Sequence, residues 1–354
     1  MEIGGRIALV VAGVSLAVMV FDAALRTFVL PRAAPVRLTR AVARWVRRAF
    51  SLVARPGHSY ERRDRVMALY GPMTLLSIPA VWLILTLAGF TAIYRGVADV
   101  SWGTAFRWSG SALLTLGFAT SEEVEVVAIV FVEAAIGLTL LALLISYLPT
   151  IYGAFSRREI AVTRLSVRAG TPPSPTELLT RAHRARFTDR LDELWEEWEL
   201  WFVEIEETHT SLVILNFFRS PNPQRSWVIA AGAVLDGAAL RSSVLNVPQT
   251  PSAAVCIRAG FTALRAIGDY FRIEYDPDPR PDTPISISRD EFMVVYEALA
   301  AEGVPVRPDR ERAWREFAGW RVNYDAVLLA LADLTMAPYA PWISDRSALR
   351  PPRA

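Results

Sequence analysis

Three long apolar runs in the first 155 residues constrain this chain more than any other feature of its sequence. They cover residues 7–30, 66–94 and 126–155, and the middle run contains no charged residue. A helix rises about 1.5 Å per residue and the hydrocarbon core of a bilayer is about 30 Å thick, so roughly 20 apolar residues suffice to cross it. Each run is therefore predicted to form a transmembrane helix.

The first run carries two charged residues, Asp22 and Arg26. A cleaved signal peptide is the rival interpretation, but no small-x-small cleavage site precedes Asp22 and the run is longer than such a segment requires. The two charges are four residues apart, so they can pair on one helix face, which lowers the cost of burying both. We predict that this run forms a spanning helix. Arg26 is expected either to extend its guanidinium group to the membrane interface or to serve a function.

The loop between the first two runs is strongly basic, because residues 32–65 contain ten arginines and only two acidic residues. The positive-inside rule places such a loop in the cytoplasm. We expect the amino terminus and residues 95–125 to lie outside and everything after residue 155 to lie inside. Arg157 and Arg158 agree with this orientation. The sequence thus predicts a multi-pass protein of the cell membrane with a cytoplasmic carboxy-terminal half.

Residues 36–53 within this loop show the period of an amphipathic helix. Arginines occupy one side, and the apolar side consists of Val42, Trp45, Val46, Ala49, Phe50 and Val53. Such a helix lies in the membrane interface and attracts anionic lipid head groups, or it packs as a cuff against neighbouring helices. Both interpretations stay open from the sequence. A net charge of only +2 gives no case for binding nucleic acid.

The segment between the second and third runs contains a further apolar stretch, residues 102–114, that is too short to cross a bilayer. Its length and position predict a re-entrant helix. It is followed by Thr115, Leu116, Gly117, Phe118, Ala119 and Thr120, and then by three acidic residues, Glu122, Glu123 and Glu125. These carboxylates are expected to concentrate cations at the outer side of the segment.

Residues 66–155 resemble the two-transmembrane potassium channel family. In this resemblance, residues 66–94 correspond to the outer helix, residues 102–114 to the pore helix and residues 126–155 to the inner helix. The family's filter reads Thr-Val-Gly-Tyr-Gly, and Thr115 to Ala119 read Thr-Leu-Gly-Phe-Ala. The resemblance implies a homotetramer that conducts monovalent cations, with K⁺ as the expected ion and no further cofactor. It also places Gly137 where the family often has a hinge in the inner helix.

Such a filter replaces the water around a cation with successive backbone carbonyl oxygens. Turning consecutive carbonyls to one side requires some residues with positive φ, which glycine tolerates and residues with a Cβ resist. Gly117 supplies one permissive position, whereas at Ala119 the left-handed region costs about 1–2 kcal/mol. We therefore expect a distorted outer filter with weak discrimination between K⁺ and Na⁺. The alternative is an outer hairpin that only packs two spanning helices together.

Glu133 lies roughly two helical turns into the third apolar run. A carboxylate inside a membrane segment is a functional candidate, because burying its charge is costly unless it is paired. The sequence equally allows a protonated carboxyl group, or one that is hydrogen-bonded behind the short helix.

Residues from Arg157 onward are predicted to form an all-helical cytoplasmic domain. Capping boxes at Ser174 and Ser288 mark helix starts, and Asn222-Pro223 and Thr250-Pro251 repeat a cap-then-proline pattern. Apolar residues at helical spacing predict one further long helix, and these are Leu191, Leu194, Trp195, Trp198, Phe202 and Ile205.

No pattern in the sequence indicates catalysis or a bound cofactor. A single cysteine, Cys256, and three scattered histidines cannot make a zinc site of familiar spacing. His209, near Glu206 and Glu207, is predicted to lie on a solvated acidic helix. The prolines among the aspartates of residues 276–282 do not fit a calcium-binding loop. No glycine-rich phosphate loop follows a strand, so a nucleotide sensor of the Rossmann type is not supported.

The predicted organisation has four parts. They are an amino-terminal transmembrane helix (1–31), a basic interfacial segment (32–65), a pore domain (66–156) and a helical cytoplasmic domain (157–354). The leading hypothesis for function is a homotetrameric ion channel. The alternative is a non-conducting, membrane-anchored scaffold or sensor whose helical domain binds a partner.

Overall fold

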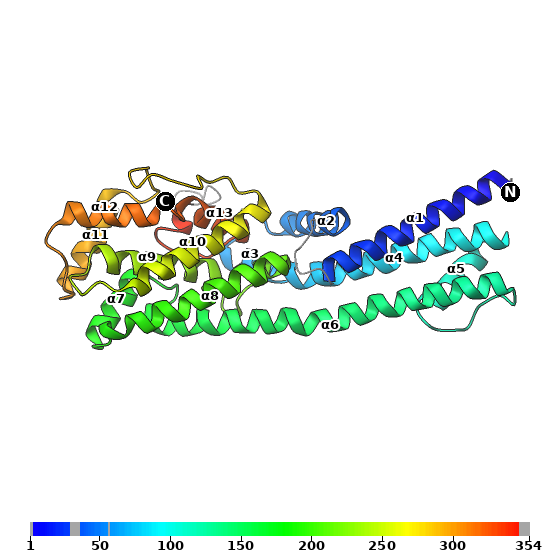
Figure 1. The fold of residues 1–354 in the computed structure, drawn as a ribbon, viewed down its shortest axis with the longest axis horizontal. Helices are drawn as coiled ribbons and strands as arrows, with labels where there is room; N and C mark the ends of the chain where they lie inside the picture. Colours follow the sequence, from blue (N-terminus) through cyan, green and yellow to red (C-terminus); the bar gives the residue numbers. More distant parts are fainter. Residues whose placement is uncertain (1–2, 29–35, 56, 347–354) are drawn as a thin grey trace. The chain divides into compact units, whose positions relative to one another are not determined.

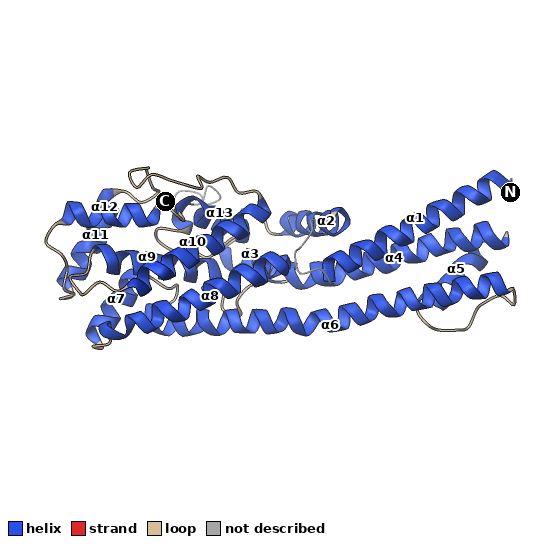
Figure 2. Cartoon of the chain, in the orientation of Figure 1, coloured by secondary structure: helices blue, strands red, loops and turns tan. Residues whose placement is uncertain are grey.

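The computed structural model describes residues 3–28, 36–55 and 57–346, and in this part of the chain the elements joined by loops are all helices, without a named strand (Figure 2). One isolated antiparallel bridge joins Leu245 to Val306. The predicted end of the first apolar run at residue 30 and the boundary at residues 31–32 lie outside the described residues. The prediction of an all-α protein is confirmed.

The chain divides into two units (Figure 1). Residues 1–53 and 69–153 form the first unit, and residues 54–68 and 154–354 form the second. The predicted basic segment 32–65 therefore contributes to both. Helix α6, Val124–Ala169, also extends from the first unit into the second.

The first unit consists of α1 (Ile3–Phe28), α2 (Arg37–Val53), α4 (Tyr70–Ala98), α5 (Trp102–Leu113) and the first part of α6. Three helical segments are long and apolar enough to cross a membrane: α1, Tyr60–Ala98 and α6. They correspond to the three predicted spans.

The third apolar run was predicted to end at residue 155, but the helix that contains it continues beyond this residue. Helix α6 continues to Ala169 and passes Pro149 without ending. Hydrophobicity falls after residue 155, but a helix ends where the backbone leaves the helical region. This happens at Gly170, whose φ of 84° is left-handed and therefore suits glycine.

Helices α1 and α4 pack closely because glycines face each other. A Cβ on Gly13 would lie 2.4 Å from the carbonyl oxygen of Gly89, so only the absence of a side chain permits the contact. Arg6 of α1 also donates to the carbonyl oxygens of Gly96 (2.9 Å) and Val97 (2.5 Å), which satisfies groups at the end of α4. The predicted pair of Asp22 and Arg26 is confirmed at 2.8 Å.

The second unit contains α3 (Tyr60–Ala68), the last part of α6, and seven further helices. These are α7 (Pro175–Arg184), α8 (Leu191–Ser211), α9 (Trp227–Ser243), α10 (Pro251–Phe271), α11 (Arg289–Ala301), α12 (Arg310–Arg321) and α13 (Asp325–Thr335), together with three short 3₁₀ helices, Thr188–Arg190, Val213–Phe217 and Ser344–Arg346. Helix α9 is apolar on all sides and is almost entirely buried, with α7, α8, α10, α12 and α13 as neighbours.

The predicted helix starts in this unit are mostly correct. Ser174 and Ser288 cap α7 and α11, and the reciprocal bonds of a capping box are present between Ser288 and Glu291. Thr250 is the N-cap of α10. The start predicted at Asn222-Pro223 was wrong, because residues 221–224 form bends and turns and α9 begins at Trp227.

Candidate functional site

The short helix predicted at residues 102–114 is present as α5, which ends one residue earlier. Ser101 caps its start and accepts a hydrogen bond from the amide of Thr104 at 3.1 Å. Ala105 on its inner face belongs to an apolar cluster with Tyr94 of α4 and Val126 of α6. Helix α5 therefore lies against two of the three helices that are able to span a membrane (Figure 1).

Gly137 of α6 lies against the end of α5. A Cβ at this position would be 2.3 Å from the carbonyl oxygen of Leu113, so the close approach requires glycine. Helix α6 is continuous through Gly137. A hinge at Gly137 stays a prediction, while its contact with Leu113 is a feature of the structure.

The loop after α5 folds back onto the last turn of that helix. The amides of Thr115 and Leu116 donate to the carbonyl oxygens of Ala112 (3.0 Å) and Ser111 (2.8 Å). The amide of Ala119 donates to the hydroxyl oxygen of Ser111 at 3.0 Å. Ser111 is buried, and its hydrogen bonds hold the loop against the last turn of α5. The sequence did not indicate this role for Ser111.

Two loop residues have positive φ, Thr115 at 55° and Gly117 at 70°. Ala119, where the left-handed region was expected to be costly, does not adopt it, because its φ is not positive. Thr115, by contrast, carries a Cβ and adopts the left-handed conformation, which is unfavourable by about 1–2 kcal/mol for such a residue. The sequence correctly indicated Gly117 as a permissive position.

The loop exposes apolar side chains. Leu116 is 60% exposed and Phe118 is 68% exposed, although both side chains are large and hydrophobic. The three predicted acidic residues, Glu122, Glu123 and Glu125, are also exposed and lie at the start of α6. The structure thus brings the loop and the acidic residues to the same end of the first unit.

Glu133 is fully buried and hydrogen-bonded by two hydroxyl groups. The hydroxyl of Tyr94 donates to one carboxylate oxygen at 2.9 Å, and the hydroxyl of Ser109 lies 2.5 Å from the other. Of the alternatives for Glu133, the structure shows the one in which it is bonded behind the short helix. The three residues come from α4, α5 and α6, so they join all three helices. The sequence pattern did not indicate Tyr94 or Ser109 as partners of Glu133.

The three helices that are able to span a membrane also line an apolar cavity of about 450 Å³. Its lining side chains come from α1, α4 and α6, and all are apolar. Such a cavity has no side-chain oxygen ligand for a cation, so it is not a candidate ion path. The loop after α5 remains the better candidate.

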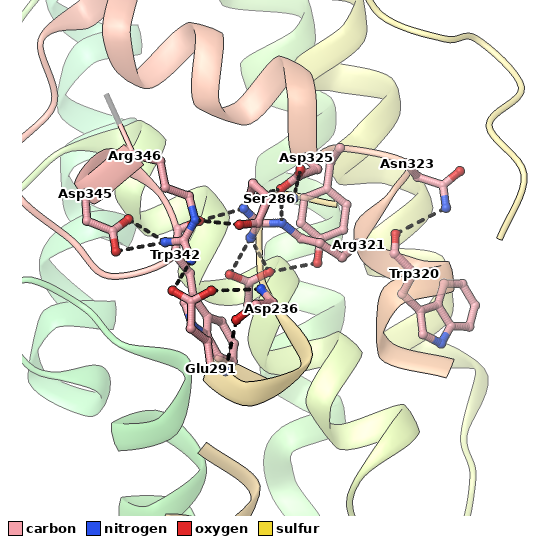
Figure 3. Close-up of polar contacts among 12 residues, drawn as sticks. Asp236, Ser286, Glu291, Trp320, Arg321, Asn323, Asp325, Trp342, Asp345 and Arg346 are labelled. Carbon is pink, nitrogen blue, oxygen red and sulfur yellow. Dashed lines mark hydrogen bonds and ion pairs between the residues drawn. The ribbon is translucent and has the colours of Figure 1, made fainter. Parts of the chain in front are cut away.

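The second unit contains a buried polar centre around Arg321 (Figure 3). Its guanidinium group contacts both carboxylate oxygens of Asp236 at 2.6 Å, Asp325 at 2.7 Å and the carbonyl oxygen of Trp342 at 2.7 Å. Burial lowers the pKa of Arg321, but the two carboxylates outweigh this effect and raise it overall. Nε and both Nη atoms of Arg321 therefore have partners in the chain, and these contacts join α9, α12 and α13.

The other residues considered from the sequence do not form a site. Cys256 is buried, and burial raises the pKa of its thiol. His209 is buried beside Arg158, so the prediction of a solvated position was wrong. Burial and then Arg158 hold the pKa of His209 well below its usual value. Among the described residues, no group of three histidine, cysteine or acidic side chains is arranged to hold a metal ion.

Comparisons with models of protein families, with curated proteins and with solved structures found no match to this chain. The geometry of the loop, of Glu133 and of α6 therefore carries the functional argument.

Proposed function

We propose that this chain is one subunit of a homotetrameric channel for monovalent cations, in which the loop from Thr115 to Ala119 forms the narrow part of the ion path. The observation that carries the proposal is the direction of the loop's peptide groups. The amides of Thr115, Leu116 and Ala119 all donate toward the last turn of α5.

In a trans peptide the carbonyl group points opposite to the amide of the next residue. The carbonyl groups of Leu114, Thr115 and Phe118 therefore point away from α5, toward the exposed side of the loop. Positive φ at Thr115 and Gly117 makes this repeated direction possible. A row of carbonyl oxygens on one side is what a dehydrated cation requires.

A single loop cannot enclose an ion path, so several copies must come together. Burial of Leu116 and Phe118 in such an assembly would remove their exposed apolar surface from water. Closed rotational symmetry completes a ring, and fourfold symmetry follows from the resemblance to potassium channels. Glu122, Glu123 and Glu125 would then form a ring of negative charge that raises the local cation concentration.

Helix α6 has a face suited to line the path beyond the loop. Thr139, Ser146 and Thr150 lie on one side by helical spacing, away from the buried side that contains Glu133 and Gly137. Each hydroxyl donates to a carbonyl oxygen of its own helix, at 2.8, 3.0 and 3.3 Å respectively. The oxygen lone pairs of these groups can therefore face water.

The bonds of Glu133 have a positioning role in this proposal. Tyr94 and Ser109 connect it to α4 and α5, so the helix that carries the loop is fixed against both of its neighbours. Buried polar groups that are satisfied in this way give a packed interior one defined arrangement.

The test is ion flux through liposomes that contain the purified chain, with K⁺, Na⁺ and Cl⁻ measured in turn. Gly117→Val and Gly57→Val are a matched pair, because neither glycine has an atom near the position of an added Cβ and only Gly117 has positive φ. A β-branched residue is strongly disfavoured at positive φ. We expect cation flux in the wild type and in Gly57→Val, and its loss in Gly117→Val.

The oligomeric state of each variant is measured in the same preparation by mass photometry. A tetrameric wild type that carries no cation flux would refute the channel, and so would a chain that is monomeric or dimeric. Unchanged flux in Gly117→Val would place the ion path elsewhere.

A further inference from the structure

Helix α2 uses one face to pack inside the first unit. Leu38, Val42 and Val46 lie in an apolar cluster with Val20 and Ala24 of α1 and with Ile78 and Trp82 of α4. The hydroxyls of Thr39 and Thr27 lie 3.1 Å apart, which adds a polar contact to α1. This face of α2 therefore packs against neighbouring helices, which is one of the two alternatives predicted from the sequence.

A second face of α2 remains exposed and is both apolar and basic. Trp45 is 68% exposed and Leu52 is 69% exposed, and the neighbouring Arg44 and Arg48 are exposed as well. The guanidinium carbon of Arg48 lies 5.4 Å from the centre of the Trp45 ring. The predicted apolar side is therefore divided, since Val42 and Val46 face the protein while Trp45 faces outward.

The packing of α2 places it beside one end of the spanning helices. Its partners Val20 and Ala24 lie in the last turns of α1, which ends at Phe28. Tyr70, the first residue of α4, donates from its hydroxyl to the carbonyl oxygen of Ala43 at 3.4 Å, and its ring centre lies 6.0 Å from that of Phe50. The part of α2 around Arg44 and Arg48 therefore lies beside the first turn of α4, and the end of a helix that is able to cross a bilayer lies near the boundary between head groups and acyl chains.

We propose that the exposed face of α2 binds an anionic phospholipid, with Arg44 and Arg48 contacting its phosphate group and with Trp45 and Leu52 lying among the first carbons of its acyl chains. Tryptophan prefers this depth because its ring is apolar and its N–H is polar. Each arginine near an anionic surface strengthens binding about fivefold.

Charge argues for a lipid and against a second copy of the same face. Helix α2 contains five arginines and no acidic residue, so two such faces would repel each other. A polyanion in solution would leave Trp45 and Leu52 exposed to water. Binding at this site does not depend on ion conduction.

The test uses native mass spectrometry of the purified full chain with phosphatidylglycerol or phosphatidylcholine added. One variant combines Arg44→Gln with Arg48→Gln. Its matched control combines Arg280→Gln with Arg312→Gln, which removes the same charge at exposed positions of the second unit. We expect the wild type and the control to prefer phosphatidylglycerol, and the α2 variant to bind it about tenfold or more weakly.

Trp45→Ala tests the apolar part of the site independently of its charged part. It removes apolar contact without changing charge, so we expect it to weaken binding of both lipids by a similar factor. Size-exclusion chromatography and circular dichroism of each variant check that it is folded. Equal affinity of the wild type for the two lipids would refute the proposal, as would full phosphatidylglycerol binding by the α2 variant. A disulfide between two chains carrying Ala49→Cys would show that a second copy covers this face and would also refute it.

Discussion

Replacing Gly137 with alanine tests whether the end of α5 depends on backbone contact with α6. An added Cβ would lie 2.3 Å from the carbonyl oxygen of Leu113 and 3.1 Å from its Cδ1. Real Cβ atoms essentially never approach another atom within 3.0 Å. The two helices would therefore have to separate by at least 0.7 Å, which is the difference between 3.0 Å and the 2.3 Å contact with Leu113. The atom in the way belongs to the backbone, so no side chain can simply rotate aside.

Overpacking of this kind costs about 1–3 kcal/mol. Gly110→Ala is the matched control, since it lies in α5 and its added Cβ would meet only Leu87 Cδ1 at 3.8 Å. Glycine-to-alanine changes inside a helix without a clash stabilise it by about 0.5–1 kcal/mol. We therefore expect the two variants to differ by about 2–4 kcal/mol in the local stability of α5.

Hydrogen exchange followed by mass spectrometry on peptides covering residues 102–120 measures this local stability. Each 1.4 kcal/mol in the free energy of local opening corresponds to about a tenfold change in exchange rate, provided that the open segment recloses faster than it exchanges. A cost of about 1–3 kcal/mol predicts exchange about five- to 150-fold faster than in the wild type for Gly137→Ala, and Gly110→Ala should exchange at the wild-type rate or more slowly. Equal exchange in both variants would refute the packing argument. Normal exchange with altered ion flux in Gly137→Ala would instead support a hinge.

Two further predictions concern the second unit. Because the pKa of His209 is held low in the folded state, the unfolded chain binds a proton there below about pH 6.5 that the folded chain excludes, so stability falls as the pH decreases through that range. The melting temperature of His209→Gln should decline less between about pH 7.5 and about pH 5.5 than that of the wild type, and parallel declines would contradict the assignment. Arg321→Met leaves Asp236 and Asp325 without their buried partner and should cost about 3–5 kcal/mol, whereas Arg312→Met at an exposed pair should cost about 1 kcal/mol or less. Similar thermal stability of these two variants would show that the buried centre contributes little.

Hydropathy and length were sufficient to predict where the helices able to span a membrane lie, because both are local properties of the sequence. The short helix α5 was predicted for the same reason. Helix ends were less accurate, since apolar residues stop near residue 155 but α6 continues to Ala169. The cap-and-proline pattern marked α10 correctly and α9 incorrectly, because residues 221–224 adopt bends and turns before α9 begins at Trp227.

The contacts within the candidate site were not predictable in the same way. Glu133 was recognisable as a buried carboxylate, but its partners Tyr94 and Ser109 lie 39 and 24 residues away along the chain. The contact of Gly137 with Leu113 likewise depends on how two helices approach each other. The conformation of the loop was not predictable either: Thr115 adopts the left-handed conformation and Ala119 does not, while the amide of Ala119 donates to the side chain of Ser111, eight residues earlier.

Helix α2 illustrates the division between sequence and structure. Its 3.6-residue period determined by itself that the arginines and the apolar residues occupy different sides, because the helix geometry fixes which residues share a side. Only the tertiary structure decided that Val42 is covered by the protein while Trp45 stays exposed, because coverage depends on which neighbouring helix packs against each part of the surface. The sequence determined which surfaces were available, and packing decided which of them remained free to bind.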